Sequence, residues 1–147
     1  MPPIGPWRAA TTPRLVRSLP DDGVVLYQGS LPTGPSSVPD PDLFVVRAGA
    51  RPVRELGQRL IAWASDDVLL VVEVSDTSLT TDLTTTKAEI YAEAGYRTYW
   101  VVSPDAVALF TQPGPRGYAS RTEFVPGDQL PVPYVAAASL DVASLLG

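Results

Sequence analysis

The residues from Val68 to Val74 constrain the fold of this chain most strongly. Their sequence, VLLVVEV, is apolar except at Glu73, which predicts a central strand covered on both faces. A carboxylate buried in such a strand costs several kcal/mol unless it is paired, hydrogen-bonded or bound to a metal. Glu73 is therefore either a functional residue or a carboxylate that reaches solvent at the rim of the sheet.

An amphipathic helix and a second strand are predicted after this strand. The helix covers Leu83–Ala94, with Asp82 or a nearby Ser or Thr as its N-cap, and the strand covers Thr98–Val102. Lys87, the only lysine of the chain, lies four residues before Tyr91, so the two side chains share a helix face.

Both helix side chains have two interpretations. Lys87 is either a site residue or an ordinary exposed lysine, and Tyr91 is either a site residue or a core residue with its hydroxyl at the rim. Asp76, in the turn after the first strand, is interpreted as a cap or as a residue that supports the site.

An acidic residue also opens an upstream strand. Asp42 follows Pro41 and precedes the apolar residues Leu43–Arg47. Alone, such an aspartate is typical of an Asx turn at a strand start, and Asp40 is the alternative candidate. Together, Asp42, Glu73 and Lys87 form a constellation of two acids on strands and one lysine on the next helix.

These stretches resemble a known family. PDLFVV, VVEVSDTSL and K-x-x-x-Y followed by AGYRTYWVV are similar to the Uma-two family of putative restriction endonucleases, which belongs to the PD-(D/E)XK nuclease superfamily. The resemblance covers roughly residues 38–118 and is most specific over residues 70–102. It implies an α/β fold of the restriction-endonuclease type, a mixed twisted sheet with a crossover helix.

The resemblance also implies a site and an activity. Asp42 and Glu73 would be metal ligands, the backbone carbonyl of Val74 a further ligand, and Lys87 the catalytic lysine. In this family the lysine lies on the helix, and the position two residues after the acid is Ser75 here. The implied function is hydrolysis of phosphodiester bonds in DNA with Mg²⁺ or Mn²⁺.

The chain departs from the family in two ways. Four residues separate Asp82 from Lys87, where the family usually has three. The helical segments that normally precede the first strands have no clear counterpart, because residues 1–20 contain five prolines. We therefore predict an extended proline-rich arm over residues 1–20 and a single PD-(D/E)XK nuclease-like domain over residues 21–147.

Composition restricts the chemistry. The chain has no Cys and no His, which excludes disulfides, Ser-His-Asp triads and the usual zinc sites. A metal would be held by oxygen ligands, which favours Mg²⁺, Mn²⁺ or Ca²⁺. No apolar run reaches the ~20 residues of a membrane span, and no signal peptide is evident, so we expect a cytoplasmic protein.

The charge is unusual for a protein that acts on nucleic acid. The net charge is −5, whereas phosphate contacts need clustered Lys and Arg. Four arginines form either a local basic patch or a solvated face: Arg47, Arg51, Arg54 and Arg59. A competing prediction is therefore a catalytically inactive nuclease-fold module that acts in protein or nucleic-acid interaction. A homodimer is also expected, since family members tend to associate.

The remaining elements are predicted from local patterns. A helix is predicted over Arg51–Ser65. A proline-punctuated loop is predicted over Pro126–Pro133, followed by a closing helix over Ser139–Leu146 with Ser139 as its N-cap. The predicted additional strands are Val24–Gln28, Ala106–Thr111 and Tyr118–Phe124.

Overall fold

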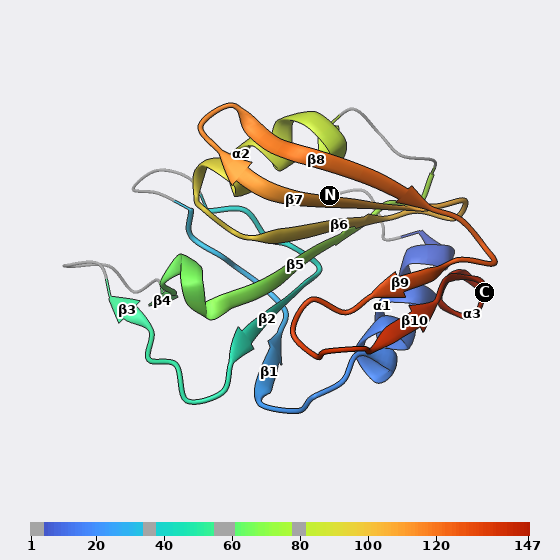
Figure 1. Cartoon of the computed structure of the whole chain (residues 1–147), viewed down its shortest axis with the longest axis horizontal. Helices are drawn as coiled ribbons and strands as arrows, with labels where there is room; N and C mark the ends of the chain where they lie inside the picture. The colour runs from blue at the N-terminus through green and yellow to red at the C-terminus, as the bar shows by residue number, and fades with distance from the viewer. Residues whose placement is uncertain (1–4, 34–37, 55–60, 78–81) are drawn as a thin grey trace.

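The computed structural model describes residues 5–33, 38–54, 61–77 and 82–147, and its centre is a six-stranded sheet (Figure 1). The helical elements are α1 (Pro6–Ser18), the 3₁₀ turn η1 (Ser65–Asp67), the π-helical turn η2 (Asp82–Thr86), α2 (Lys87–Glu93) and α3 (Val142–Leu146). The strands are β1 (Val24–Tyr27), β2 (Leu43–Arg47), β3 (Val53–Arg54), β4 (Ile61–Ala62), β5 (Val68–Val74), β6 (Thr98–Val102), β7 (Val107–Gly114), β8 (Gly117–Phe124), β9 (Gln129–Pro131) and β10 (Ser139–Asp141).

The central sheet is mixed. Its strand order is β1-β2-β5-β6-β7-β8, and β5 and β6 are parallel, whereas the other neighbouring pairs are antiparallel. The chain between β5 and β6 contains η2 and α2, as a parallel pair requires a crossover connection. The predicted α/β fold with a mixed sheet and a crossover helix is confirmed.

Apolar side chains cover both faces of β5. Leu70, Val72 and Val74 belong to a core that includes residues of α1, α3 and the β9–β10 pair. Val71 belongs to the second core, on the α2 side, where Tyr91 and Tyr99 are fully buried. This arrangement explains the nearly continuous apolar sequence of the strand, because each of its faces has its own layer.

The N-terminal prediction is wrong for the described residues. Residues 6–18 form the helix α1 and are not an extended arm, so the fold does contain a helix before its first strand. Pro6 occupies the first helical turn, where its missing N–H is not needed. Pro13 lies inside the helix, which tertiary contacts must therefore stabilise.

No helix among the described residues is long and apolar enough to cross a membrane.

The segment before β5 also differs from its prediction. The described parts of Arg51–Ser65 contain β3 and β4, which pair with each other, and the first residue of η1. They do not form the predicted helix. The half-buried Trp63 packs its ring against Tyr27, with centroids 5.2 Å apart. Burial of this aromatic ring takes precedence over the approximate helical spacing of the segment.

The C-terminal segment contains a strand pair that the sequence patterns missed. β9 lies within the predicted loop and pairs with β10, whose first residue is Ser139. The closing helix α3 therefore starts later than predicted. Its N-cap is Asp141, whose Oδ2 accepts a hydrogen bond from the backbone N–H of Ser144 at 3.2 Å. Leu130 and Leu140 are buried, which anchors the two short strands on the core.

Candidate active site

The two acids of the constellation lie at the same end of neighbouring strands. β2 runs antiparallel to β5, with Leu43 opposite Val72. Continuing this register by one residue places Asp42 opposite Glu73, and side chains directly opposite in such a pair have Cβ atoms about 4.5–5.5 Å apart. An acid at the start of one strand and an acid near the end of its neighbour therefore meet. That the two carboxylates lie within about 5 Å of each other stays a prediction.

Asp42, which directly precedes β2, hydrogen-bonds to the part of β5 that β2 does not cover. The N–H of Ser75 donates to the carbonyl of Val102 in β6 at 2.8 Å, so the N–H and C=O of Val74 point to the opposite side, toward β2. The N–H of Val74 donates to Asp42 Oδ2 at 2.6 Å. The carbonyl of Val74 lies on this same side of the strand, as a further metal ligand would require.

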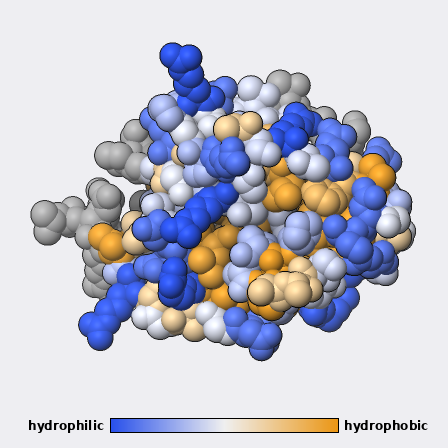
Figure 2. Space-filling model, in the orientation of Figure 1, coloured by the Kyte–Doolittle hydropathy of each residue, from blue (hydrophilic) through white to orange (hydrophobic). Residues whose placement is uncertain are grey.

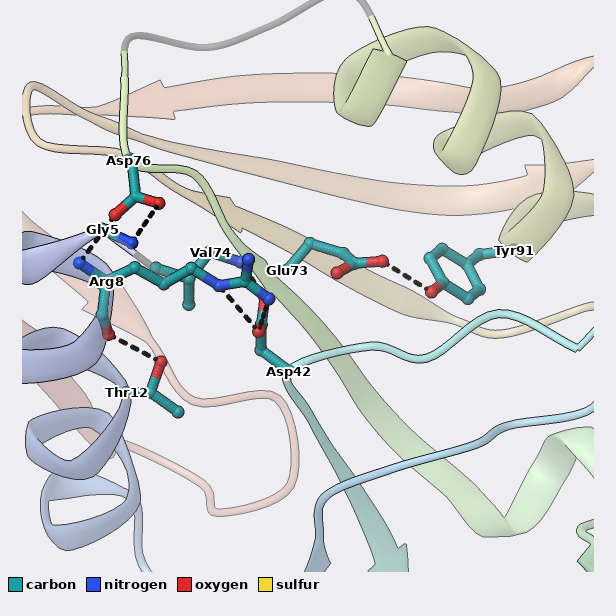
Figure 3. Close-up of polar contacts among 8 residues, drawn as sticks. All are labelled: Gly5, Arg8, Thr12, Asp42, Glu73, Val74, Asp76 and Tyr91. Atoms are coloured by element: carbon teal, nitrogen blue, oxygen red, sulfur yellow. Dashed lines mark hydrogen bonds and ion pairs between the residues drawn. The ribbon is translucent and has the colours of Figure 1, made fainter. Parts of the chain in front are cut away.

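Glu73 is buried and carries an electrostatic cost. Only 6% of the residue is exposed, and Tyr91 donates its hydroxyl proton to Glu73 Oε2 at 2.9 Å (Figure 3). The pKa of Glu73 is raised to about 7, mainly because the carboxylate is buried and also because Asp42 is negatively charged. The Tyr91 hydrogen bond and the charges of Lys87 and Arg8 lower it. Additional positive charge at this position would favour the ionised carboxylate.

Tyr91 is a buried core residue that also contacts Glu73. Its ring is fully buried between the sheet and α2, and its hydroxyl contacts Glu73. Burial, together with the charge of Glu73, raises the pKa of the Tyr91 hydroxyl, which therefore stays protonated and acts as a hydrogen-bond donor.

Lys87 begins α2, one turn before Tyr91. The two residues share a helix face, Lys87 is half-buried, and its charge contributes to the pKa of Glu73. The preceding turn, η2, is π-helical from Asp82 to Thr86. A π turn bonds residue i to residue i+5 and so contains about one residue more than an α-helical turn, which matches the longer spacing between Asp82 and Lys87.

Arg8 is a site residue that sequence reasoning missed. From the first turns of α1 it extends to Asp42, where both Nε, at 3.0 Å, and Nη2 donate to Oδ1 (Figure 3). Burial alone would lower the pKa of Arg8, but the hydrogen bond and the charge of Asp42, with the charges of Asp76 and Glu73, raise it. The Gly5–Pro6 pair signals only the start of the helix that carries Arg8, since proline at the first helical position is typical of a helix start.

Two other acids are assigned by their contacts. Asp76 caps α1: its Oδ1 accepts the N–H of Arg8 at 2.9 Å, and its Oδ2 accepts the N–H of Gly5 at 3.2 Å. Its interpretation as a cap therefore holds, although for a helix from another part of the chain.

Asp40, the alternative to Asp42, is exposed and accepts a hydrogen bond from Ser30 at 2.7 Å. Neither the strand register nor the contacts of Asp40 place it with Glu73.

The fold defines a nuclease-like α/β protein, in which two adjacent strands bring acids to one end of a mixed sheet beside a crossover helix. The chain belongs to the Uma2 family, described as "Putative restriction endonuclease", whose model matches residues 1–143. This match includes α1, which the predicted arm had placed outside the domain.

A solved structure has the same fold. It is the crystal structure of a protein from Anabaena variabilis ATCC 29413, described as a putative nuclease belonging to DUF820. The two chains are 16% identical, with a TM-score of 0.75, and the match covers 99% of this chain and 83% of that chain. Among proteins with curated descriptions, none matches this chain.

Proposed function

We propose that this protein is a metal-dependent endonuclease that hydrolyses phosphodiester bonds in DNA. Asp42, Glu73 and the carbonyl of Val74 would hold Mg²⁺ or Mn²⁺, and Lys87 would be the catalytic lysine. The observation that carries the proposal is Glu73, a buried carboxylate with a raised pKa, placed by strand register opposite a second acid. Membership of the Uma2 family supports the reaction class.

The donor set fits a hard divalent cation. Two carboxylates and one carbonyl are oxygen ligands, which Mg²⁺ and Mn²⁺ prefer. No cluster of three or more Asp, Glu, His or Cys that could hold a metal occurs in the parts of the chain that the structure describes. The cation would therefore keep several waters, as is usual for Mg²⁺ bound by one or two carboxylates.

The side chains of this site have distinct tasks. Tyr91 holds Glu73 through its hydroxyl, and the N–H of Val74 holds Asp42, so both carboxylates are oriented before a ligand binds. Lys87 supplies positive charge on the Glu73 side, where it would stabilise charge that develops on the phosphate. When bound, the cation would polarise the phosphate and lower the pKa of bound water.

The activity is tested with supercoiled plasmid DNA. We expect the protein to nick or linearise the plasmid in Mg²⁺ or Mn²⁺ and to lose this activity completely in EDTA, because no described side chain replaces the function of the cation. Plasmid that stays supercoiled at high protein concentration in both metals would contradict the proposal.

A second candidate function is a catalytically inactive interaction module. It is favoured by Arg8, which already neutralises Asp42 without a metal, and by the net charge of −5. The module differs from the enzyme in its response to cations: its melting temperature would be the same with and without Mn²⁺, whereas a cation that binds the folded enzyme must raise it.

We also propose that the protein forms a homodimer. Among the described residues, β8 is an edge strand of eight residues, and its unpaired backbone groups can pair with a second copy. Apolar side chains also lie between hydrophilic ones on the face shown in Figure 2. Light scattering at micromolar concentration should give twice the 15.7 kDa mass of one chain, and a monomeric mass there would contradict the dimer.

A further inference from the structure

Arg8 lies in the first turn of α1, which Asp76 caps. The carboxylate of Asp76 accepts the backbone N–H groups of both Gly5 and Arg8 and so docks the start of α1 at the end of β5. A Cβ atom at Gly5 would lie 2.4 Å from the Asp76 carboxyl carbon, so a larger residue there would displace the Asp76 carboxylate from the helix start. The first turn of α1 is therefore built to bring Arg8 to the site.

Asp42 has little capacity left for a cation while Arg8 holds it. Asp42 Oδ1 accepts two N–H groups of the guanidinium, and Oδ2 accepts the N–H of Val74. A carboxylate has about two acceptor positions on each oxygen, so Oδ1 is saturated. For Asp42 to bind a metal through Oδ1, the guanidinium must move.

A pocket beside Asp42 can accommodate the displaced guanidinium. An open pocket of about 350 Å³ lies beside Asp42 and is lined by Arg8, Ala9, Thr12, Pro13, Gln28 and Asp42. The Arg8 side chain is 33% exposed, so it reaches this pocket without unpacking a core. A planar guanidinium binds phosphate oxygens in the same forked manner in which it binds a carboxylate.

We propose that Arg8 is a phosphate-binding residue of this site, one that neutralises Asp42 in the metal-free protein and binds a substrate phosphate once a divalent cation occupies Asp42. This proposal rests on the proposed nuclease function and extends it to a residue on α1. Two consequences follow. Arg8 competes with the cation, and Arg8 contributes to binding of nucleic acid.

The first consequence is tested by calorimetric titration of Mn²⁺ into the wild type, Arg8→Ala and Arg8→Gln. Removing a charge-assisted contact that competes for Asp42 should strengthen Mn²⁺ binding by about tenfold in Arg8→Ala. Arg8→Gln, which keeps hydrogen-bond donors near Asp42, should fall between the two and provides the test if the alanine variant does not fold. Arg17→Ala is the matched control, because it removes an exposed positive charge from the same helix.

The second consequence is tested by fluorescence anisotropy with a short fluorescein-labelled DNA duplex in Ca²⁺. Arg8→Ala should weaken DNA binding by about tenfold, whereas Arg17→Ala should weaken it by no more than about threefold, as one general charge would. If Arg8 had a purely structural role, its substitution would not strengthen metal binding and at the same time weaken DNA binding.

The outcomes separate this proposal from the nuclease function. Arg8 variants that are folded but bind Mn²⁺ no more tightly than wild type, or bind DNA as Arg17→Ala does, would overturn the role of Arg8. If wild type and Arg17→Ala still cleave DNA in that case, the nuclease function stands without it. Absence of Mn²⁺ binding in all four proteins would overturn both.

Discussion

Glu73→Gln is expected to raise the free energy of unfolding of the metal-free protein at pH 8 by up to about 3 kcal/mol. The pKa of Glu73 is about 7 in the folded protein, against 4.5 for an ordinary glutamate. Between these values the folded state holds a proton that the unfolded state has lost, so stability falls as pH rises from about 4.5 to about 7. Above pH 7 the full cost of the buried charge is present.

The variant removes this cost and keeps the contact to Tyr91, since a glutamine carbonyl accepts the same hydroxyl proton. Urea denaturation in EDTA at pH 5 and pH 8 measures the effect. The difference between variant and wild type should be small at pH 5 and large at pH 8. Glu123→Gln, at an exposed glutamate of β8, is the control and should change stability by less than about 0.5 kcal/mol at either pH.

The same substitution should reverse its effect when Mn²⁺ is added. A cation bound by Glu73 stabilises the folded wild type, and a neutral glutamine loses this contribution. A variant that is less stable than wild type in EDTA at pH 8 would show that Glu73 is not a costly buried charge, and the physical argument for a cation at this position would then fail.

Lys87→Ala is expected to reduce Mg²⁺-dependent plasmid cleavage by about a hundredfold or more, the size of effect seen when a charge that stabilises a transition state is removed. The fold should remain, because alanine is the best helix former and the ammonium group makes no ion pair among the described residues. The pKa of Glu73 should rise further, since the charge of Lys87 lowers it.

The assay compares initial rates of plasmid nicking for wild type and variant, together with their circular dichroism spectra. Arg97→Ala is the control, because Arg97 precedes β6 and thus lies at the opposite end of the parallel β5–β6 pair from Glu73. Arg97 forms an exposed ion pair with Asp66, so the Arg97→Ala variant should cleave like wild type. Cleavage by folded Lys87→Ala at the wild-type rate would remove Lys87 from the mechanism.

The centre of the fold could be predicted because its signals are local. The apolar run of β5 and the periodicity of the segment that forms η2 and α2 are readable in a single sequence. The opposed positions of Asp42 and Glu73, in contrast, depend on the register between the antiparallel strands β2 and β5, which the structure gives. The resemblance to the Uma2 family implied that both acids belong to one site, and the family match confirms the resemblance.

The elements that were missed depend on contacts between distant parts of the chain. α1 contains two prolines and is stabilised by hydrogen bonds to distant residues. Asp76 accepts a backbone N–H of the helix, the indole N–H of Trp7 donates to the carbonyl of Leu146, and Arg14 donates to the carbonyl of Leu145. These partners lie between 68 and 139 residues away in the sequence. Local propensity therefore predicts an extended segment, and tertiary hydrogen bonds reverse that preference.

The role of Arg8 was hidden for the same reason. Its partner Asp42 lies 34 residues away, and nothing in the Pro6–Arg8 sequence indicates a site. The short strands β9 and β10 were missed because each has only three residues and is stabilised by its partner strand and by one buried leucine, a pattern too short to show strand periodicity.

The central claim, that Asp42 and Glu73 share a divalent cation, is tested most directly by a crystal structure of the protein soaked in Mn²⁺, with anomalous diffraction to locate the ion. We expect one anomalous peak, bonded at about 2.1 Å to an oxygen of each carboxylate and to the carbonyl of Val74, with the Arg8 guanidinium displaced from Asp42 Oδ1. A structure at saturating Mn²⁺ with no peak within bonding distance of either carboxylate, and with Arg8 still on Asp42, would contradict it.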